Sequence, residues 1–257
     1  MRGRIRWKNG AAVPTGQKRR TGRSVLIRDR ILDLFYPPRC PICGRIPDRG
    51  LICRACADTL RYVDRQYCMK CGRPLEDGRA EYCGDCEKIR HAFDQGRSLL
   101  SYQGAVRQSL YRFKYANCRE YARFYAAGIC SRLGEFIQTR EITVLASVPL
   151  HPARQKQRGY NQAALLAERI GAELGIPVED RLLTRIKSTV PQKQLSGCQR
   201  KSNLDRAFQA GRKIQPEERI LLIDDIYTTG ATADAAAAAL RQAGARRVYV
   251  ITAAIGG

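Results

Sequence analysis

The sequence predicts an α/β domain with a mainly parallel, doubly wound sheet, preceded by a small cysteine-rich module. The first observation is that, from residue 93 onward, short apolar segments alternate with longer amphipathic or alanine-rich segments. Strands that alternate with helices favour a parallel sheet. The second observation is that eight of the eleven cysteines form four C-x-x-C pairs ahead of this pattern. A chain of 257 residues is long enough for one large domain and one small one.

The chain begins with a basic segment, residues 1–23, which contains eight Lys or Arg residues and no acidic residue. This composition predicts a disordered tail that attracts anions. The segment lacks the apolar core of a signal peptide, and no apolar run approaches the roughly 18 residues that span a bilayer. We therefore expect a cytoplasmic protein with no membrane span. Residues 24–39 are predicted to form a short helix and linker, which Pro37 and Pro38 terminate.

The cysteine module is expected over residues 40–90, and its pairs are Cys40/Cys43, Cys53/Cys56, Cys68/Cys71 and Cys83/Cys86. Segments 40–45 and 68–73 share the pattern C-x-x-C-G-R, which makes the module a repeat of one four-cysteine unit. Four thiolates fill a tetrahedral zinc site and leave no open position, so two structural zinc ions are expected. The repeat favours ligation by successive pairs. Crossed ligation, an iron–sulfur cluster and redox dithiols are the alternatives.

The α/β domain is expected over residues 91–257. Its strands are predicted at 98–102, 143–148, 219–223 and 247–253, and its helices at 105–114, 119–136, 161–174 and 232–243. Residues 87–257 carry 27 Lys and Arg residues against 15 acidic residues. The net charge of +22 favours a polyanionic partner, such as nucleic acid or a phosphorylated small molecule. Of the two histidines, His91 lies in no motif, and His151, beside prolines, is expected to be structural rather than catalytic.

The clearest functional motif is ILLIDDIYTTGAT at residues 220–232. An apolar strand runs into two adjacent acids, and a turn rich in hydroxyl groups then opens a helix. Amides and hydroxyls at a helix N-terminus bind phosphate, and the carboxylates can accept hydrogen bonds from the vicinal hydroxyls of a ribose. An ordinary strand and turn with a threonine-capped helix is the alternative, and it leaves the two acids unexplained. The expected ligand contacts here are Asp224, Asp225, Thr228, Thr229, Gly230, Ala231 and Thr232.

This motif resembles the phosphoribosyl pyrophosphate signature of type I phosphoribosyltransferases, and residues 36–255 as a whole are similar to the ComF family. Residues 148–162 resemble that family's pyrophosphate loop, and residues 185–208 resemble its flexible loop. Residues 110–115 resemble its lead-in helix. The resemblance implies a type I phosphoribosyltransferase fold preceded by a double zinc ribbon.

The same resemblance implies that the chain binds phosphoribosyl pyrophosphate with Mg²⁺. The residues it adds to the ligand site are Arg154, Arg158, Gly159, Asn161, Gln192 and Arg200. It implies that Arg158 acts in catalysis together with Asp224 and Asp225. The implied reaction transfers a phosphoribosyl (pentosyl) group from phosphoribosyl pyrophosphate to an acceptor and releases pyrophosphate. The acceptor is open, because the acceptor site of this fold comes from a variable segment.

A function of a different class is a non-catalytic competence factor that binds single-stranded DNA, because the resemblance implies a role in DNA uptake during natural transformation. Positive charge favours such binding, and several aromatic residues could stack on bases. They are Tyr111, Phe113, Tyr115, Tyr121, Phe124 and Tyr125. A sensor of phosphoribosyl pyrophosphate without turnover is the third alternative. Competence and DNA-processing proteins are the expected protein partners.

Overall fold

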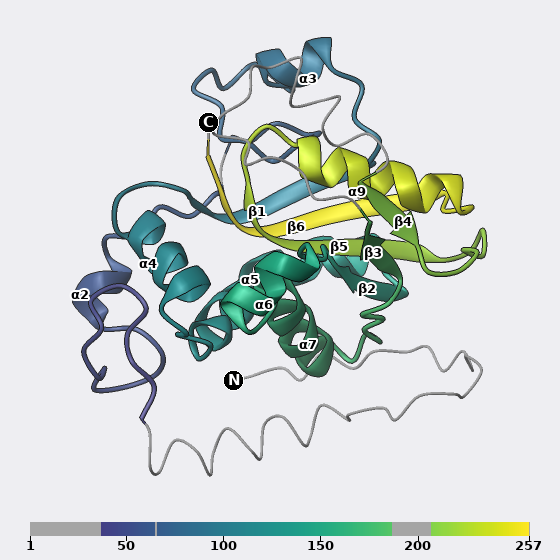
Figure 1. The fold of residues 1–257 in the computed structure, drawn as a ribbon. Coiled ribbons are helices and arrows are strands. Elements are labelled where there is room, and N and C mark those ends of the chain that lie inside the picture. Colours follow the sequence, from purple (N-terminus) through teal and green to yellow (C-terminus); the bar gives the residue numbers. More distant parts are fainter. Residues whose placement is uncertain (1–36, 65, 187–206, 257) are drawn as a thin grey trace.

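The computed structural model describes residues 37–64, 66–186 and 207–256. Its centre is a four-stranded sheet in the order β1-β6-β5-β2, in which every neighbouring pair is parallel (Figure 1). The strands are β1 (Gln95–Ser101), β2 (Val144–Ser147), β5 (Arg219–Tyr227) and β6 (Arg247–Ile255). The basic tail and the predicted contacts Gln192 and Arg200 lie outside the described residues.

Helices cover both faces of the sheet. On one face these are α5 (Tyr121–Thr139) and α7 (Gln162–Leu174), and on the other face α9 (Ala231–Gln242). Leu221 and Ile223 of β5 pack in the core beside α5 and α7. Ile220 and Leu222 pack in the core beside α9. Because successive side chains of a strand point to opposite faces, an unbroken apolar run suits a strand that is buried on both. The doubly wound α/β prediction is confirmed.

Strand β5 is four residues longer than predicted, because its pairing with β6 continues as far as Tyr227 and Ile255. The predicted strand ended at residue 223, ahead of the two acids. Asp224 and Asp225 instead lie inside the last part of β5. Regular strand backbone therefore fixes both carboxylates, and the hydroxyl-rich turn begins only after Tyr227.

Three short elements of the α/β domain escaped the sequence analysis, because they are too short to show a period. They are α6 (Pro152–Arg158), β3 (Leu183–Arg185) and β4 (Phe208–Ala210). Strands β3 and β4 pair antiparallel in a second, small sheet. Their buried side chains Leu183 and Phe208 pack in the same core as α9.

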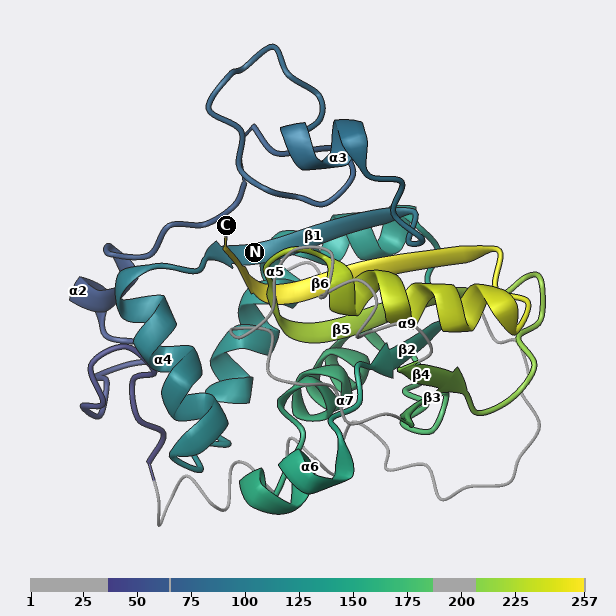
Figure 2. The same cartoon turned by 45° about the horizontal axis from the view of Figure 1, so that its top comes forward.

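The cysteine module forms two ribbons that contact different parts of the α/β domain (Figure 2). The first ribbon, residues 37–64, contains α2 (Arg54–Ala57) and lies beside α4 (Gly104–Tyr115). The second ribbon, residues 66–90, contains α3 (Gly84–Lys88) and packs on β1. The second ribbon's Gly72 touches β1 so closely that a Cβ there would lie 2.8 Å from the Gly96 carbonyl oxygen. The ribbons and the sheet are therefore one packed unit.

Candidate functional site

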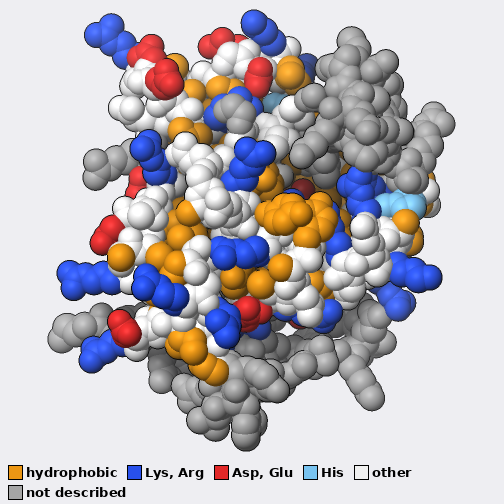
Figure 3. All heavy atoms as spheres, turned by 60° about the vertical axis from the view of Figure 1, so that its left-hand side comes forward, with side chains coloured by type: hydrophobic (Ala, Val, Ile, Leu, Met, Phe, Trp, Pro, Cys, Tyr) orange, Lys and Arg blue, Asp and Glu red, His pale blue; other side chains and the backbone are white. Residues whose placement is uncertain are grey.

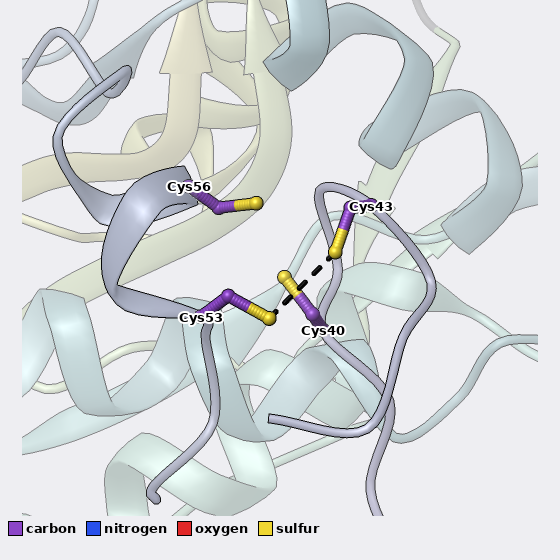
Figure 4. Close-up of side chains that lie close together, drawn as sticks. All are labelled: Cys40, Cys43, Cys53 and Cys56. Atoms are coloured by element: carbon purple, nitrogen blue, oxygen red, sulfur yellow. Dashed lines mark hydrogen bonds between the residues drawn. The ribbon is translucent and has the colours of Figure 1, made fainter. Parts of the chain in front are cut away.

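Successive cysteine pairs of the first ribbon form the first cluster. Cys40, Cys43, Cys53 and Cys56 place their Sγ atoms within 4.8 Å of one another, and the side chains point toward one another (Figure 4). The Sγ atoms of Cys43 and Cys53 are 3.7 Å apart. Gly44, with a φ of 78°, turns the chain back so that its amide donates to the Cys40 carbonyl at 2.9 Å.

The second ribbon repeats this geometry. Its cluster consists of Cys68, Cys71, Cys83 and Cys86, again with all Sγ atoms within 4.8 Å of one another. The Sγ atoms of Cys71 and Cys83 are 3.7 Å apart, and the Gly72 amide donates to the Cys68 carbonyl at 2.9 Å. Ligation by successive pairs, which the repeat favoured, is the arrangement that the fold provides.

Both clusters fit zinc. Zn–S bonds of about 2.3 Å in a tetrahedron place neighbouring sulfur atoms about 3.8 Å apart, and the separations of 3.7 Å match this value. Zinc needs thiolates. In the first cluster the backbone amide of Arg45 lowers the pKa of Cys43 to about 6, whereas burial raises the pKa values of Cys53 and Cys56, so zinc binding must release protons there. Four sulfur ligands leave no position for water or substrate, so the role of such a centre is structural.

The motif at residues 220–232 spans most of β5, the turn at residues 228–230 and the first two residues of α9. Thr228 and Thr229 are exposed, and Gly230 precedes the helix with a φ of 78°. The hydroxyl of Tyr227 fills the space that a Cβ at residue 230 would need, so the position requires glycine. Ala231 and Thr232 follow as the first, half-buried residues of α9.

The N-terminus of α9 differs from the two other helix starts near the site. His151 caps α6 and Asn161 caps α7 by accepting hydrogen bonds from the amides of Ala153 and Ala163. In the part of the chain that the structure describes, no side chain caps α9. Its first amides and the positive end of its dipole are thus available to an anion.

One of the two acids of β5, Asp225, pairs with a lysine from α4. Lys114 Nζ lies 2.9 Å from Asp225 Oδ1, and their side chains are 18% and 12% exposed. Burial opposes the charge of Lys114, but the Asp225 carboxylate raises the pKa of Lys114 above its ordinary value. Burial and the neighbouring charge of Asp225 raise the pKa of Asp224 to about 7. Lys114 lies in the predicted lead-in helix but was not predicted as a site residue.

Arg158, a predicted catalytic residue, lies at the end of α6 and reaches α4. Its guanidinium donates to the Tyr115 hydroxyl at 3.0 Å and to the Gln162 side chain at 3.2 Å. It also lies over the Tyr115 ring, 4.8 Å from the centroid. Gly159 ends α6 with a φ of 75°, which turns the chain toward α7. The structure thus brings α4 and α6 together beside the acid pair.

Arg154 also lies in α6, and Arg185 of β3 is a second residue that the sequence analysis missed. Burial, followed by the charge of Arg154, lowers the pKa of Arg185, while the charge of Asp224 raises it. The charges of Arg154 and Asp224 therefore both act on Arg185. Arg185 lies in the segment predicted as the flexible loop, where no sequence signal separates it from other basic residues.

Asn161 and His151 have structural roles in the ligand-free chain. Asn161 caps α7 and donates to the Val148 carbonyl at 3.0 Å, which fastens α7 to the end of β2. His151, expected to be structural, caps α6 at 3.3 Å. The placement of Asn161 as a ligand contact stays a prediction.

The aromatic residues predicted as a stacking group separate into two sets. Phe113, Tyr121, Phe124 and Tyr125 are buried in the core. Tyr111 and Tyr115 are 64% and 54% exposed, with ring centroids 4.9 Å apart. An open hollow of about 730 Å³ adjoins them and is lined by Tyr102, Gly104, Arg107, Gln108, Tyr111 and Arg112. On this side of the molecule, apolar side chains adjoin Lys and Arg side chains (Figure 3).

The fold and the two clusters define a class of protein, in which a double zinc ribbon precedes a parallel α/β domain of the phosphoribosyltransferase type. Residues 31–87 match the family model of the double zinc ribbon domain. In the described part of the chain, no helix has both the length and the apolar character needed to cross a membrane.

Three relatives identify the family. The chain is 30% identical over 224 residues to Competence protein F of Haemophilus influenzae, covering 84% of this chain and 96% of that protein. It is 30% identical over 202 residues to Competence protein ComFC of Bacillus subtilis, covering 75% and 79%. It is 30% identical over 226 residues to DNA utilization protein YhgH of Salmonella typhimurium, covering 84% and 96%. The chain belongs to this family of ComF-type competence proteins, as its motifs predicted.

Proposed function

We propose that the chain binds phosphoribosyl pyrophosphate with Mg²⁺ at the carboxyl end of β5 and transfers the phosphoribosyl group to an acceptor. The observation that carries this proposal is the pairing of Lys114 with Asp225 directly ahead of the uncapped N-terminus of α9. Ligands of open parallel sheets bind at the carboxyl ends of the strands. A phosphate site and a carboxylate pair at this edge match the two ends of a ribose 5-phosphate.

In this proposal each group has one task. The amides of the loop and of α9, with the hydroxyls of Thr228 and Thr229, hold the 5-phosphate. Asp224 and Asp225 accept hydrogen bonds from the ribose hydroxyls and face the positive charge that develops on the ring. Lys114 holds the Asp225 carboxylate in place for that task through their ion pair.

The leaving pyrophosphate lies on the side of α6. Arg154 and Arg158 are the cations that this helix offers there, and Arg158 acts beside the acid pair. Mg²⁺, bound together with the ligand, supplies further positive charge to the leaving group. Gly159 lets the backbone turn between the arginines and α7. A reducing compartment such as the cytoplasm keeps the eight thiolates available for zinc.

Thermal denaturation of the zinc-loaded full chain tests the proposal. A ligand at 100 times its Kd stabilises by about 2.7 kcal/mol, so phosphoribosyl pyrophosphate with Mg²⁺ should raise the Tm by roughly 5 °C or more. The double variant Asp224→Asn with Asp225→Asn should lose this shift. The control Glu217→Gln, an exposed acid just ahead of the opposite end of β5, should keep it. An equal shift in the double variant would refute a ribose site at these carboxylates.

We propose binding of single-stranded DNA as a second function, located on α4. It is supported by the exposed pair Tyr111 and Tyr115, by Arg107 in the adjoining hollow, and by the net charge of +22. Base stacking on aromatic side chains and phosphate contacts by cations are the elements of such sites. The relatives named as competence and DNA utilization proteins support a role in DNA uptake, with competence or DNA-processing proteins as partners.

Fluorescence anisotropy with a labelled oligonucleotide tests this second function. Affinity should fall steeply as salt rises. Replacing Tyr111 and Tyr115 together by alanine should weaken binding roughly tenfold or more. Tyr82→Ala is the matched control, because Tyr82 is 44% exposed but lies on the second ribbon. Failure of the full chain to bind at low salt would end this proposal, and binding that ignores salt would contradict its charge argument.

A further inference from the structure

The second ribbon contacts the phosphate-binding loop of the proposed function, which consists of residues 228–230 between β5 and α9. Arg73, the last residue of the second C-x-x-C-G-R repeat, donates from Nη2 to the Thr228 carbonyl at 3.0 Å. The same nitrogen lies 3.3 Å from Asp85 Oδ2. Asp85 stands between the ligand pair Cys83 and Cys86, so the arginine is held by both halves of one zinc ribbon.

Fixing the Thr228 carbonyl also fixes an amide. The peptide group between residues 228 and 229 is planar and trans, so its C=O and its N–H point in opposite directions. Because the carbonyl of Thr228 points back to Arg73, the amide of Thr229 points away from the ribbon. This is the direction from which a phosphate would approach the loop.

Two further contacts hold the start of α9 from the same side. His91, which is 8% exposed, follows the ribbon and places Nδ1 2.6 Å from Asp234 Oδ2. The Ala92 amide donates to Asp234 Oδ1 at 2.8 Å, and the Asp234 amide donates to the Gly230 carbonyl at 2.8 Å. A carboxylate only accepts, so His91 donates from Nδ1. The linker after the ribbon thus anchors the first turn of α9.

Apolar packing completes this connection. Tyr227, whose hydroxyl covers Gly230, is 4% exposed and meets the Phe93 ring edge-on, with centroids 6.2 Å apart. Cys68 and Cys71 belong to the same buried cluster as both rings. The metal ligands and the loop therefore share one core.

The first ribbon provides the contrast. Its repeat-related arginine, Arg45, is exposed, and its side chain interacts with Cys43 of its own cluster. The two arginines occupy the same position of the C-x-x-C-G-R pattern, so a difference between their variants reflects where each ribbon lies in the fold.

We propose that Arg73 is a positioning residue for the phosphate-binding loop: through it, the second zinc ribbon holds the Thr229 amide and the start of α9 toward the ligand. The identity of that ligand rests on the function proposed above, but the positioning itself does not. Loss of Arg73 therefore loosens the loop in the ligand-free chain and weakens binding of a phosphorylated ligand.

The test compares Arg73→Met, Arg73→Lys and the control Arg45→Met in the zinc-loaded full chain. Hydrogen exchange over residues 226–234, measured without ligand, reports positioning. Calorimetry with phosphoribosyl pyrophosphate and Mg²⁺ reports affinity, and elemental analysis reports zinc. We expect Arg73→Met to keep two zinc ions, to exchange these amides about tenfold faster and to bind about tenfold more weakly. Arg73→Lys, which retains a donor, should recover part of both effects, and Arg45→Met should show neither.

Wild-type exchange in an Arg73→Met chain that holds two zinc ions would overturn the proposal. If the wild-type chain does not bind phosphoribosyl pyrophosphate, the proposed function fails, and the exchange data alone then decide the positioning role. Should Arg73→Met lose zinc or fail to fold, Asp85→Asn replaces it, since this variant retains every thiolate and the arginine. Loop exchange that stays at the wild-type rate in Asp85→Asn would equally count against the proposal.

Discussion

The two ribbons share the pattern C-x-x-C-G-R, but their arginine hydrogen bonds with the α/β domain run in opposite directions. In the second ribbon, Arg73 donates to the carbonyl of Thr228, in the loop that is proposed to bind phosphate. In the first ribbon, the donor belongs to the domain: Arg112 of α4 donates to the carbonyls of Pro41 and Ile42, the two residues between Cys40 and Cys43, at 2.9 and 2.6 Å. The repeat therefore specifies two similar metal sites, while the packing decides what each ribbon does for the rest of the protein.

The first ribbon approaches the ligand site through α4. Arg112 holds the ribbon, and Lys114, two residues on, pairs with Asp225. Residues two apart on a helix do not share a face, so α4 bridges the ribbon and the acid pair. The second ribbon contacts the loop directly. Loss of the second metal centre should therefore disturb ligand binding more than loss of the first.

The largest expected effect comes from removing one metal ligand at the same repeat position in each ribbon. Cys71 is 2% exposed and lies in the core with Tyr227, whereas Cys43 is exposed. We expect Cys71→Ser to lower the Tm by roughly 10 °C or more and to abolish binding of phosphoribosyl pyrophosphate, because structural zinc supplies folding energy. Cys43→Ser should retain ligand binding. Elemental analysis, thermal denaturation and calorimetry measure these effects.

Each of these variants should retain one zinc ion per chain. Iron in place of zinc, or loss of both ions from one substitution, would contradict two independent zinc ribbons. Equal loss of ligand binding in Cys43→Ser and Cys71→Ser would remove the contrast between the ribbons.

An effect of intermediate size concerns pH. The pKa of Asp224 is raised to about 7 in the folded chain, from an ordinary value near 4. The folded state therefore binds this proton more tightly than the unfolded state, and the contribution of Asp224 to stability falls as pH rises from about 4 to 7. The slope is at most about 1.4 kcal/mol per pH unit. Asp224→Asn should remove this slope from the free energy of unfolding, measured by urea denaturation without ligand.

The difference between wild type and Asp224→Asn cancels the groups that titrate independently of Asp224 and leaves the titration of Asp224 with the neighbours that interact with it. A difference that stays constant from pH 4 to 7 would show that the environment of Asp224 does not favour its protonated form.

The smallest expected effect is that of Arg112→Met. The two hydrogen bonds of the Arg112 side chain hold the backbone between Cys40 and Cys43. Each bond to a charged donor contributes about 1.5–3 kcal/mol. Hydrogen exchange should therefore speed up at residues 40–45 by roughly tenfold or more, and exchange at residues 226–234 should stay unchanged. Faster exchange at the phosphate-binding loop would show that the first ribbon also positions it.

The long elements and the metal clusters could be predicted from the sequence, because their signals are local. Helix α7 carries its own cap, Asn161, and its own stop, Gly175. The cysteine spacing and the repeat favoured the two groups of thiols that the fold brings together, with crossed ligation left as an alternative. Strand β5 was predicted too short because its last four residues depend on pairing with β6, which is not encoded locally.

The contacts between the ribbons and the site could not be predicted, because the shared C-x-x-C-G-R pattern has different partners in the two ribbons. Arg45 and Arg73 both follow a C-x-x-C-G pattern, yet only the fold distinguishes them. Lys114 and Arg185 are two basic residues among many in a chain of net charge +22. Their relation to the acids of β5 depends on how α4 and β3 pack.

The most direct test of the central claim is hydrogen exchange of the zinc-loaded full chain with and without phosphoribosyl pyrophosphate and Mg²⁺. A ligand that binds between the acids of β5 and the start of α9 should slow exchange at residues 224–234 and at the end of α4. Protection absent from residues 224–234, with binding established by calorimetry, would place the ligand elsewhere and contradict the site proposed here.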